Sequence, residues 1–104
     1  MVVMDAEKVF NEVGRFLSGN QSSSMFGVAC FKIGRKPFIM FYDSQIVCKL
    51  SGSIHEEACQ LAGTSLFNPK RNDKPMVNWV QIPYVYMERW AYFARFAYEQ
   101  VKGE

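Results

Sequence analysis

The stretch SSSMFGVACFKIGRKPFIMFYDSQIVCKL, residues 22–50, decides the fold of this chain. It contains three apolar runs separated by two short polar segments, GRKP at 34–37 and DSQ at 43–45. Aromatic and β-branched residues favour strands, whereas glycine, proline and aspartate favour tight turns. The pattern predicts an antiparallel meander with strands at residues 25–33, 38–42 and 46–50. The middle strand is apolar on both faces, which indicates a central strand or one that faces a partner.

An amphipathic helix precedes this meander. Asp5 can accept hydrogen bonds from the free amides of a first helical turn, and Gly19 suits a left-handed helix end. The sequence therefore predicts a helix over residues 6–17. Its apolar residues recur at spacings of three and four, the period of one helix face: Val9, Phe10, Val13, Phe16 and Leu17.

A second helix is predicted in SGSIHEEACQLAG, residues 51–63. Ser53 and Glu56 have the spacing of a capping box, and Gly63 ends the segment. Short and longer strands follow around residues 66–67 and at 76–82. The apolar stripe of the helix consists of Ile54, Ala58, Leu61 and Ala62.

The last segment predicts a helix over residues 85–101 that is apolar over more than one face. Such a helix is either deeply buried or shared with another subunit. Its main stripe is Met87, Trp90, Ala91, Ala94, Ala97, Tyr98 and Val101, extended by Tyr92, Phe93 and Phe96. The element order α-β-β-β-α-β-β-α then predicts an α+β two-layer sandwich, an antiparallel sheet with helices packed on it, formed by residues 1–104 as one domain.

Composition excludes several classes of protein. The 104 residues carry a net charge of +2, weaker than the clustered excess of a dedicated nucleic-acid binder. No apolar run approaches the roughly 20 residues of a membrane span, and the N-terminus has no signal-peptide pattern. The three cysteines cannot all pair within the chain, because their number is odd. These features predict a cytoplasmic protein with reduced thiols and no membrane association.

The residues of a catalytic or metal site are missing from the sequence. His55 and Cys59 would share a helix face, but two ligands are too few for a structural zinc site, which needs four. There is no G-x-S-x-G nucleophile elbow and no phosphate-binding G-x-x-x-x-G-K-[ST] loop. We therefore expect no enzymatic activity, no catalytic residues, no metal and no cofactor.

Several short motifs carry a resemblance to a known family. They are MFG at residues 25–27 (Met25, Phe26 and Gly27), FKIGRKPFIMFY at 31–42, a strand ending in KL, AGTSLFNP at 62–69, WVQIP at 79–83, and a closing helix with Trp90 and several alanines. This pattern resembles the TfoX N-terminal domain family and, more loosely, the YjbR-like proteins, and the similarity covers about residues 7–101.

The resemblance implies a fold similar to that of type III secretion chaperones, with the topology derived above. It also implies a stand-alone version of a module that precedes a second domain in the competence regulators of the family. Ser22, Ser23 and Ser24 stand where relatives often carry a basic residue, so any role of that residue does not carry over. The family brings no catalytic residues.

Three functional hypotheses follow. The favoured one is a regulatory or protein-interaction module, either a homodimer or a protein that docks a different partner. The second is nucleic-acid binding through the basic turn at Lys70, Arg71 and Lys74, with Trp79 or Tyr84 stacking on bases. The third is a small-ligand pocket between the sheet and the last helix, lined by Trp90, Phe31 and Tyr86. The candidate partner contacts are thus Lys70, Arg71, Lys74, Trp79 and Trp90.

Overall fold

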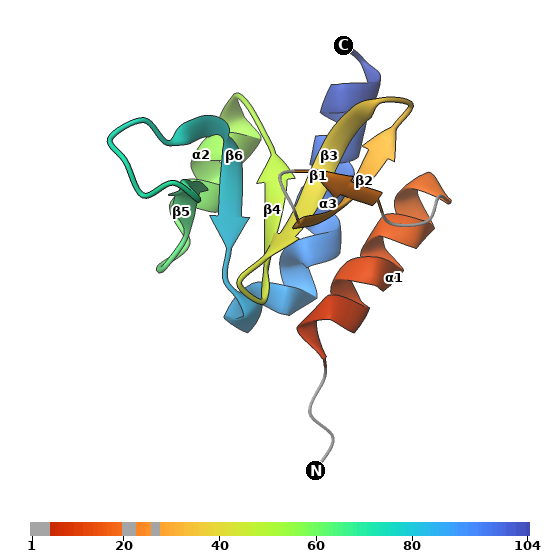
Figure 1. Ribbon diagram of the computed structural model, residues 1–104, viewed down its shortest axis with the longest axis horizontal. Coiled ribbons are helices and arrows are strands. Elements are labelled where there is room, and N and C mark those ends of the chain that lie inside the picture. The colour runs from red at the N-terminus through yellow and green to blue at the C-terminus, as the bar shows by residue number, and fades with distance from the viewer. Residues whose placement is uncertain (1–4, 20–22, 26–27) are drawn as a thin grey trace.

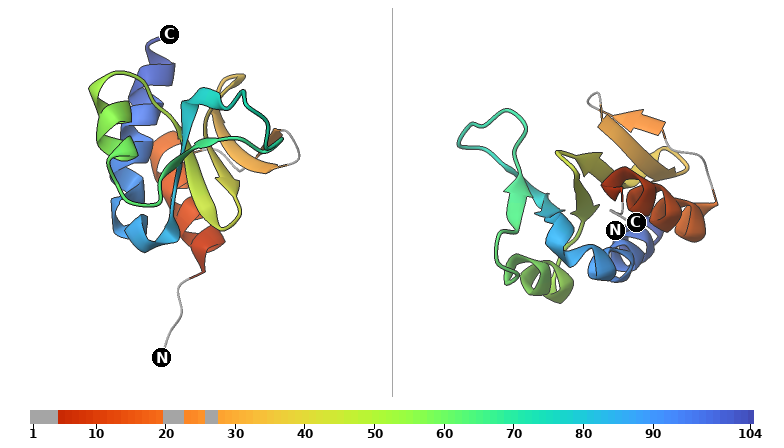
Figure 2. Two further views of the ribbon diagram at one scale, coloured as in Figure 1. Left: turned by 90° about the vertical axis from the view of Figure 1, so that its left-hand side faces the viewer. Right: turned by 90° about the horizontal axis from the view of Figure 1, so that it is seen from below.

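The computed structural model describes residues 5–19, 23–25 and 28–104, with Met25 described by its backbone only. Within these residues, six strands form one antiparallel sheet in the order β1-β2-β3-β4-β6-β5, and the helices pack on one of its faces (Figures 1 and 2). The predicted α+β sandwich is confirmed. The strands are β1 (Ser23–Met25), β2 (Val28–Ile33), β3 (Lys36–Tyr42), β4 (Gln45–Lys49), β5 (Ser65–Phe67) and β6 (Met76–Ile82). The helices are α1 (Ala6–Ser18), α2 (Ser53–Cys59), the 3-10 helix η1 (Tyr84–Arg89) and α3 (Trp90–Lys102).

The strand predicted at residues 25–33 is in fact two strands. β1 and β2 pair antiparallel, with Ser23 opposite Cys30 and Met25 opposite Val28. The prediction was wrong here because alternation of side chains looks alike in one long strand and in the two arms of a hairpin. Of the MFG motif, Met25 ends β1, whereas Phe26 and Gly27 lie outside the described residues.

A β-bulge in β3 turns an extra side chain toward the helices. Phe31 pairs with Ile39 and Lys32 with Pro37, so Phe38 is an extra residue on β3. A bulge of this kind turns two consecutive side chains toward one face. Phe38 and Ile39 accordingly both join the helix-side core, where the Phe38 ring meets the edge of Tyr98 at a centroid distance of 5.4 Å.

The main core lies between the sheet and the helices. Phe10 of α1 packs against Phe31 and Phe41, each with ring centroids 5.3 Å away. Gly14, one turn further along α1, is buried directly against the Phe31 ring. The helices contribute Val9 and Phe10 from α1, Ile54 and Ala58 from α2, and Trp90, Phe93, Ala94, Ala97 and Val101 from α3.

A second, smaller core fills the sheet face that carries no helix. Met40 of β3 is fully buried there, although its neighbour Ile39 faces the helices. β3 is therefore buried on both faces and lies between β2 and β4, as its sequence predicts for a central strand. This cluster consists of Cys30, Met40, Val47, Phe67 and Trp79, with Val28, Tyr42 and Met76 packed around it.

The helix ends agree with the sequence only in part. Asp5 caps α1 by accepting from the amide of Glu7 at 2.9 Å, and Gly19 closes that helix in the left-handed conformation, both as predicted. The capping box of α2 is absent: Gly52, at φ +73°, takes the N-cap position and Ser53 is already helical. Ser53 and Glu56 therefore each lie one position further into the helix than a capping box requires.

The predicted helix over residues 85–101 is broken near its start. Tyr84–Arg89 form the 3-10 helix η1, with Tyr86 outside helical dihedrals, and the α-helix begins at Trp90. The indole Nε1 of Trp90 donates to the carbonyl of Pro83 at 3.2 Å, which holds the tighter turn against the helix. No helix within the described residues is long and apolar enough to cross a membrane.

Candidate functional site

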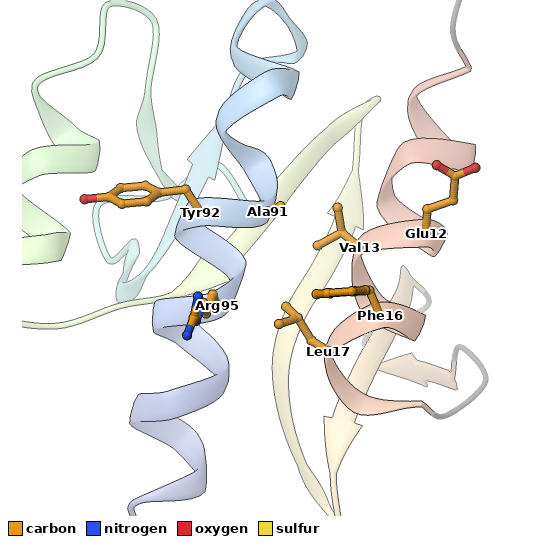
Figure 3. A pocket seen from close by; sticks show the side chains of 7 residues that line it. All are labelled: Glu12, Val13, Phe16, Leu17, Ala91, Tyr92 and Arg95. Carbon is orange, nitrogen blue, oxygen red and sulfur yellow. The ribbon is translucent and has the colours of Figure 1, made fainter.

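An open apolar groove runs between α1 and α3 on the outer surface of the helical layer. Val13, Phe16 and Leu17 point from α1 toward α3 across this groove (Figure 3). Its volume is about 500 Å³. The lining residues are Glu12, Val13, Phe16 and Leu17 from α1, and Ala91, Tyr92 and Arg95 from α3.

Phe16 is the outstanding residue of the groove because 87% of its surface is exposed. It lies on the same side of α1 as Val9, which is buried, and Val13, which is half-buried. The sequence prediction grouped Phe16 with this face, but the core covers Val9 fully and Val13 and Leu17 in part, and it leaves Phe16 exposed.

Aromatic residues of α3 extend the apolar surface. Tyr92 and Phe96 are 42% and 40% exposed, and their rings meet edge to face at a centroid distance of 5.2 Å. Both lie outside the buried face of α3. The all-round apolar pattern of this helix therefore divides between a core face and an exposed face.

A polar cluster fixes the Tyr92 ring, which points away from α1 (Figure 3). The Tyr92 hydroxyl donates to Glu57 Oε1 at 3.2 Å, and the other carboxylate oxygen of Glu57 pairs with Arg89 at 3.0 Å. The hydrogen bond to Glu57, aided by burial and by the negative charge of Glu57, raises the pKa of Tyr92. The Arg89 guanidinium also lies 5.4 Å from the centre of the Tyr92 ring. Tyr92 is thus held in one orientation without a partner.

Two charged residues flank the groove from opposite helices. Glu12 of α1 and Arg95 of α3 both line it, and both are exposed. Neither forms an ion pair with any residue that the structure describes. An apolar floor with one acidic and one basic residue at its borders is suited to docking a protein surface.

The basic turn lies far along the sheet from this groove. Lys70, Arg71 and Lys74 are exposed in the β5–β6 loop, where Arg71 has a φ of +51°. Trp79 is only 7% exposed and belongs to the second core, so its ring is not available to stack on bases. Tyr84 packs edge to face against Trp90 instead of facing the loop. The structure therefore leaves the three cations without the aromatic partners that the sequence suggested.

The interior site predicted around Trp90 is solid core. Trp90 and Phe31 are both fully buried in the main core, and Tyr86 packs against it. The Tyr86 hydroxyl donates to the carbonyl of Ala62 at 2.7 Å. Trp90 is thus a core residue and offers no side-chain surface to a partner. Protein atoms fill the space in which the sequence placed a ligand.

His55 and Cys59 do lie together, as their spacing predicted. The Cys59 sulfur is 3.7 Å from His55 Nδ1, and His55 Nε2 is 2.8 Å from the carbonyl oxygen of Val77. Because a carbonyl oxygen only accepts, His55 Nε2 carries a proton and donates to it. No group of three or more potential metal ligands of the His, Cys, Asp or Glu type occurs within the described part of the chain.

Comparisons with protein-family models, with curated proteins and with solved structures found no match to this chain. The resemblance to the TfoX N-terminal family accordingly stays a prediction from its motifs. The groove was not among the sites predicted from the sequence. The signal that could have located it is the surplus of apolar residues on α3, combined with Phe16 at the edge of the apolar stripe of α1.

Proposed function

We propose that this protein is a non-enzymatic interaction module that self-associates through the groove between α1 and α3. The observation that carries the proposal is the 87% exposure of Phe16 in an apolar groove lined by both helices. Aromatic side chains are enriched where proteins meet, and an exposed aromatic residue in an apolar groove is a feature of docking surfaces. A regulatory role and a cytoplasmic location complete the proposal; the support for both is the sequence alone.

A second copy is the occupant favoured by the charges of the groove. One acidic and one basic residue border the same apolar floor, so the surface is complementary to itself. A partner of a different sequence would need no such balance. Self-association also buries the exposed Phe16 without the need for a different protein.

Light scattering coupled to size-exclusion chromatography tests the proposal at several micromolar concentrations. We expect a species of twice the 12.0 kDa chain mass, and we expect Phe16→Ser to convert it to the monomer. Val77→Ser is the matched control, because Val77 is 63% exposed but lies on β6. It should leave the dimer intact.

A monomer at every concentration would overturn the proposal. The basic turn would then become the leading candidate, tested by retention on a DNA column at increasing salt. Loss of that retention on charge reversal of Lys70 and Arg71 would indicate nucleic-acid binding through phosphates.

A further inference from the structure

We propose that two protomers pack with α1 of each lying on α3 of the other, so that Glu12 of one protomer pairs with Arg95 of its partner. This arrangement rests on the self-association proposed above and names its geometry. It follows from the position of the apolar and charged residues around the groove.

Two simple two-fold arrangements can bring one groove onto another. An axis that runs along the groove places α1 of one protomer on α3 of its partner. An axis that runs across the groove places α1 on α1 and α3 on α3. Both arrangements cover the apolar floor, because α1 and α3 each contribute apolar residues to it. Apolar burial alone does not choose between them.

The charges at the borders of the groove distinguish the two arrangements. Glu12 belongs to α1 and Arg95 to α3. With α1 on α1, the acidic border of each groove faces the acidic border of the other, and the basic border faces the basic one. With α1 on α3, the border with Glu12 faces the border with Arg95, and symmetry gives this favourable pairing twice. Like charges across an interface are unfavourable, so the arrangement with α1 on α3 is preferred.

Phe16 gives this arrangement its apolar contact. Its ring already points across the groove toward α3 (Figure 3). A partner lying over the groove covers Phe16, which is 87% exposed, together with Val13 and Leu17, which line the groove beside it.

A charge exchange between two variants tests the arrangement. Glu12→Arg and Arg95→Glu each replace two attractive contacts by two repulsive ones, and each variant alone should weaken the dimer by about tenfold or more. An equimolar mixture restores both attractive contacts, since each protomer then faces the opposite charge. We expect the mixture to form heterodimers with a Kd within about threefold of that of the unaltered protein.

The mixture distinguishes a contact between two protomers from a disturbance within one of them. A change confined within one protomer would not be repaired by mixing, and equal thermal melting curves would show that both variants are folded. Glu88→Arg, an exposed site on η1, serves as the charge control and should leave the dimer unchanged. If both variants are monomers and their mixture stays monomeric, or if both remain dimers, the arrangement is wrong although self-association stands. If the unaltered protein is itself a monomer, self-association fails as well.

Discussion

Gly14 of α1 and Phe31 of β2 approach so closely that no side chain fits between them. A Cβ atom placed on Gly14 would overlap three atoms of the Phe31 ring, well inside van der Waals contact. The missing side chain lets the helix backbone lie directly on an aromatic ring of the sheet. This contact positions α1, and with it the groove.

We therefore expect Gly14→Ala to destabilise the protein, although alanine favours a helix over glycine by about 1 kcal/mol. Overpacking of a close contact typically costs about 1–3 kcal/mol, and here the rigid ring is flanked by Phe10. Urea denaturation measures the loss. Phe31→Leu in the same chain makes room at position 14, so the two changes together should cost less than the sum of their separate effects. Strict additivity would show that this contact does not limit the packing.

This contact shows what the sequence can and cannot predict. The spacing of apolar residues predicted α1 within one residue of its end, and the turns at Gly34 and at Asp43 and Ser44 were read correctly from glycine and aspartate. The role of Gly14 was invisible, because it depends on a strand that the chain reaches only later. Local sequence patterns determine where helices and strands form, whereas a close contact such as that of Gly14 with Phe31 depends on how those elements pack together.

The candidate site was predictable only in part for the same reason. The sequence indicated that the last helix has more apolar surface than one core face can use, and this surplus lies at Tyr92 and Phe96. It placed Phe16 in a stripe with Val9 and Val13, since all three share a side of α1. Whether the far end of that stripe is covered depends on the relative positions of α1 and α3. No periodicity within either helix contains that information.

The hydrogen bond between Tyr92 and Glu57 predicts a delayed titration of one tyrosine. Hydrogen bonding to the Glu57 carboxylate raises the pKa of Tyr92 above the ordinary value of about 10. A raised folded-state pKa means that this contribution to stability is present below about pH 10 and is lost as the pH rises through the higher value. Ultraviolet absorbance of tyrosinate should show a high-pH component that is lost in Tyr92→Phe and shifted to lower pH in Glu57→Gln. An unchanged titration curve in Glu57→Gln would contradict the role of the carboxylate.

The cysteines should differ sharply in reactivity. All three lie within the described residues; Cys30 and Cys48 are buried, whereas Cys59 is exposed. Burial raises the pKa of the Cys48 thiol well above its usual range, and it raises the pKa of Cys59 as well. A disulfide reagent should modify one thiol in the native protein and three in denaturant, with a native rate that still rises above about pH 8.5, the usual thiol value. Cys59→Ser should remove the native reaction, and rapid modification of two or three thiols would indicate an opened core.

Gln100 should anchor the end of α3 to the loop after β4. Its side-chain oxygen accepts from the Ser51 amide at 3.0 Å, and its Nε2 donates to the Ser51 carbonyl at 2.9 Å. Gln100→Ala removes both bonds and should cost about 1–2 kcal/mol of unfolding free energy, measured by urea denaturation. Gln100→Glu keeps an acceptor for the amide but sets a carboxylate against the carbonyl, so it should not restore the loss. Gln60→Ala, at an exposed position just after α2, is the control and should stay within about 0.5 kcal/mol of the unaltered protein. Full stability of Gln100→Ala would mean that water replaces both bonds without cost, and that the apolar face of α3 and the ion pairs of Glu104 with Lys36 and Lys49 hold this end of the helix to the sheet.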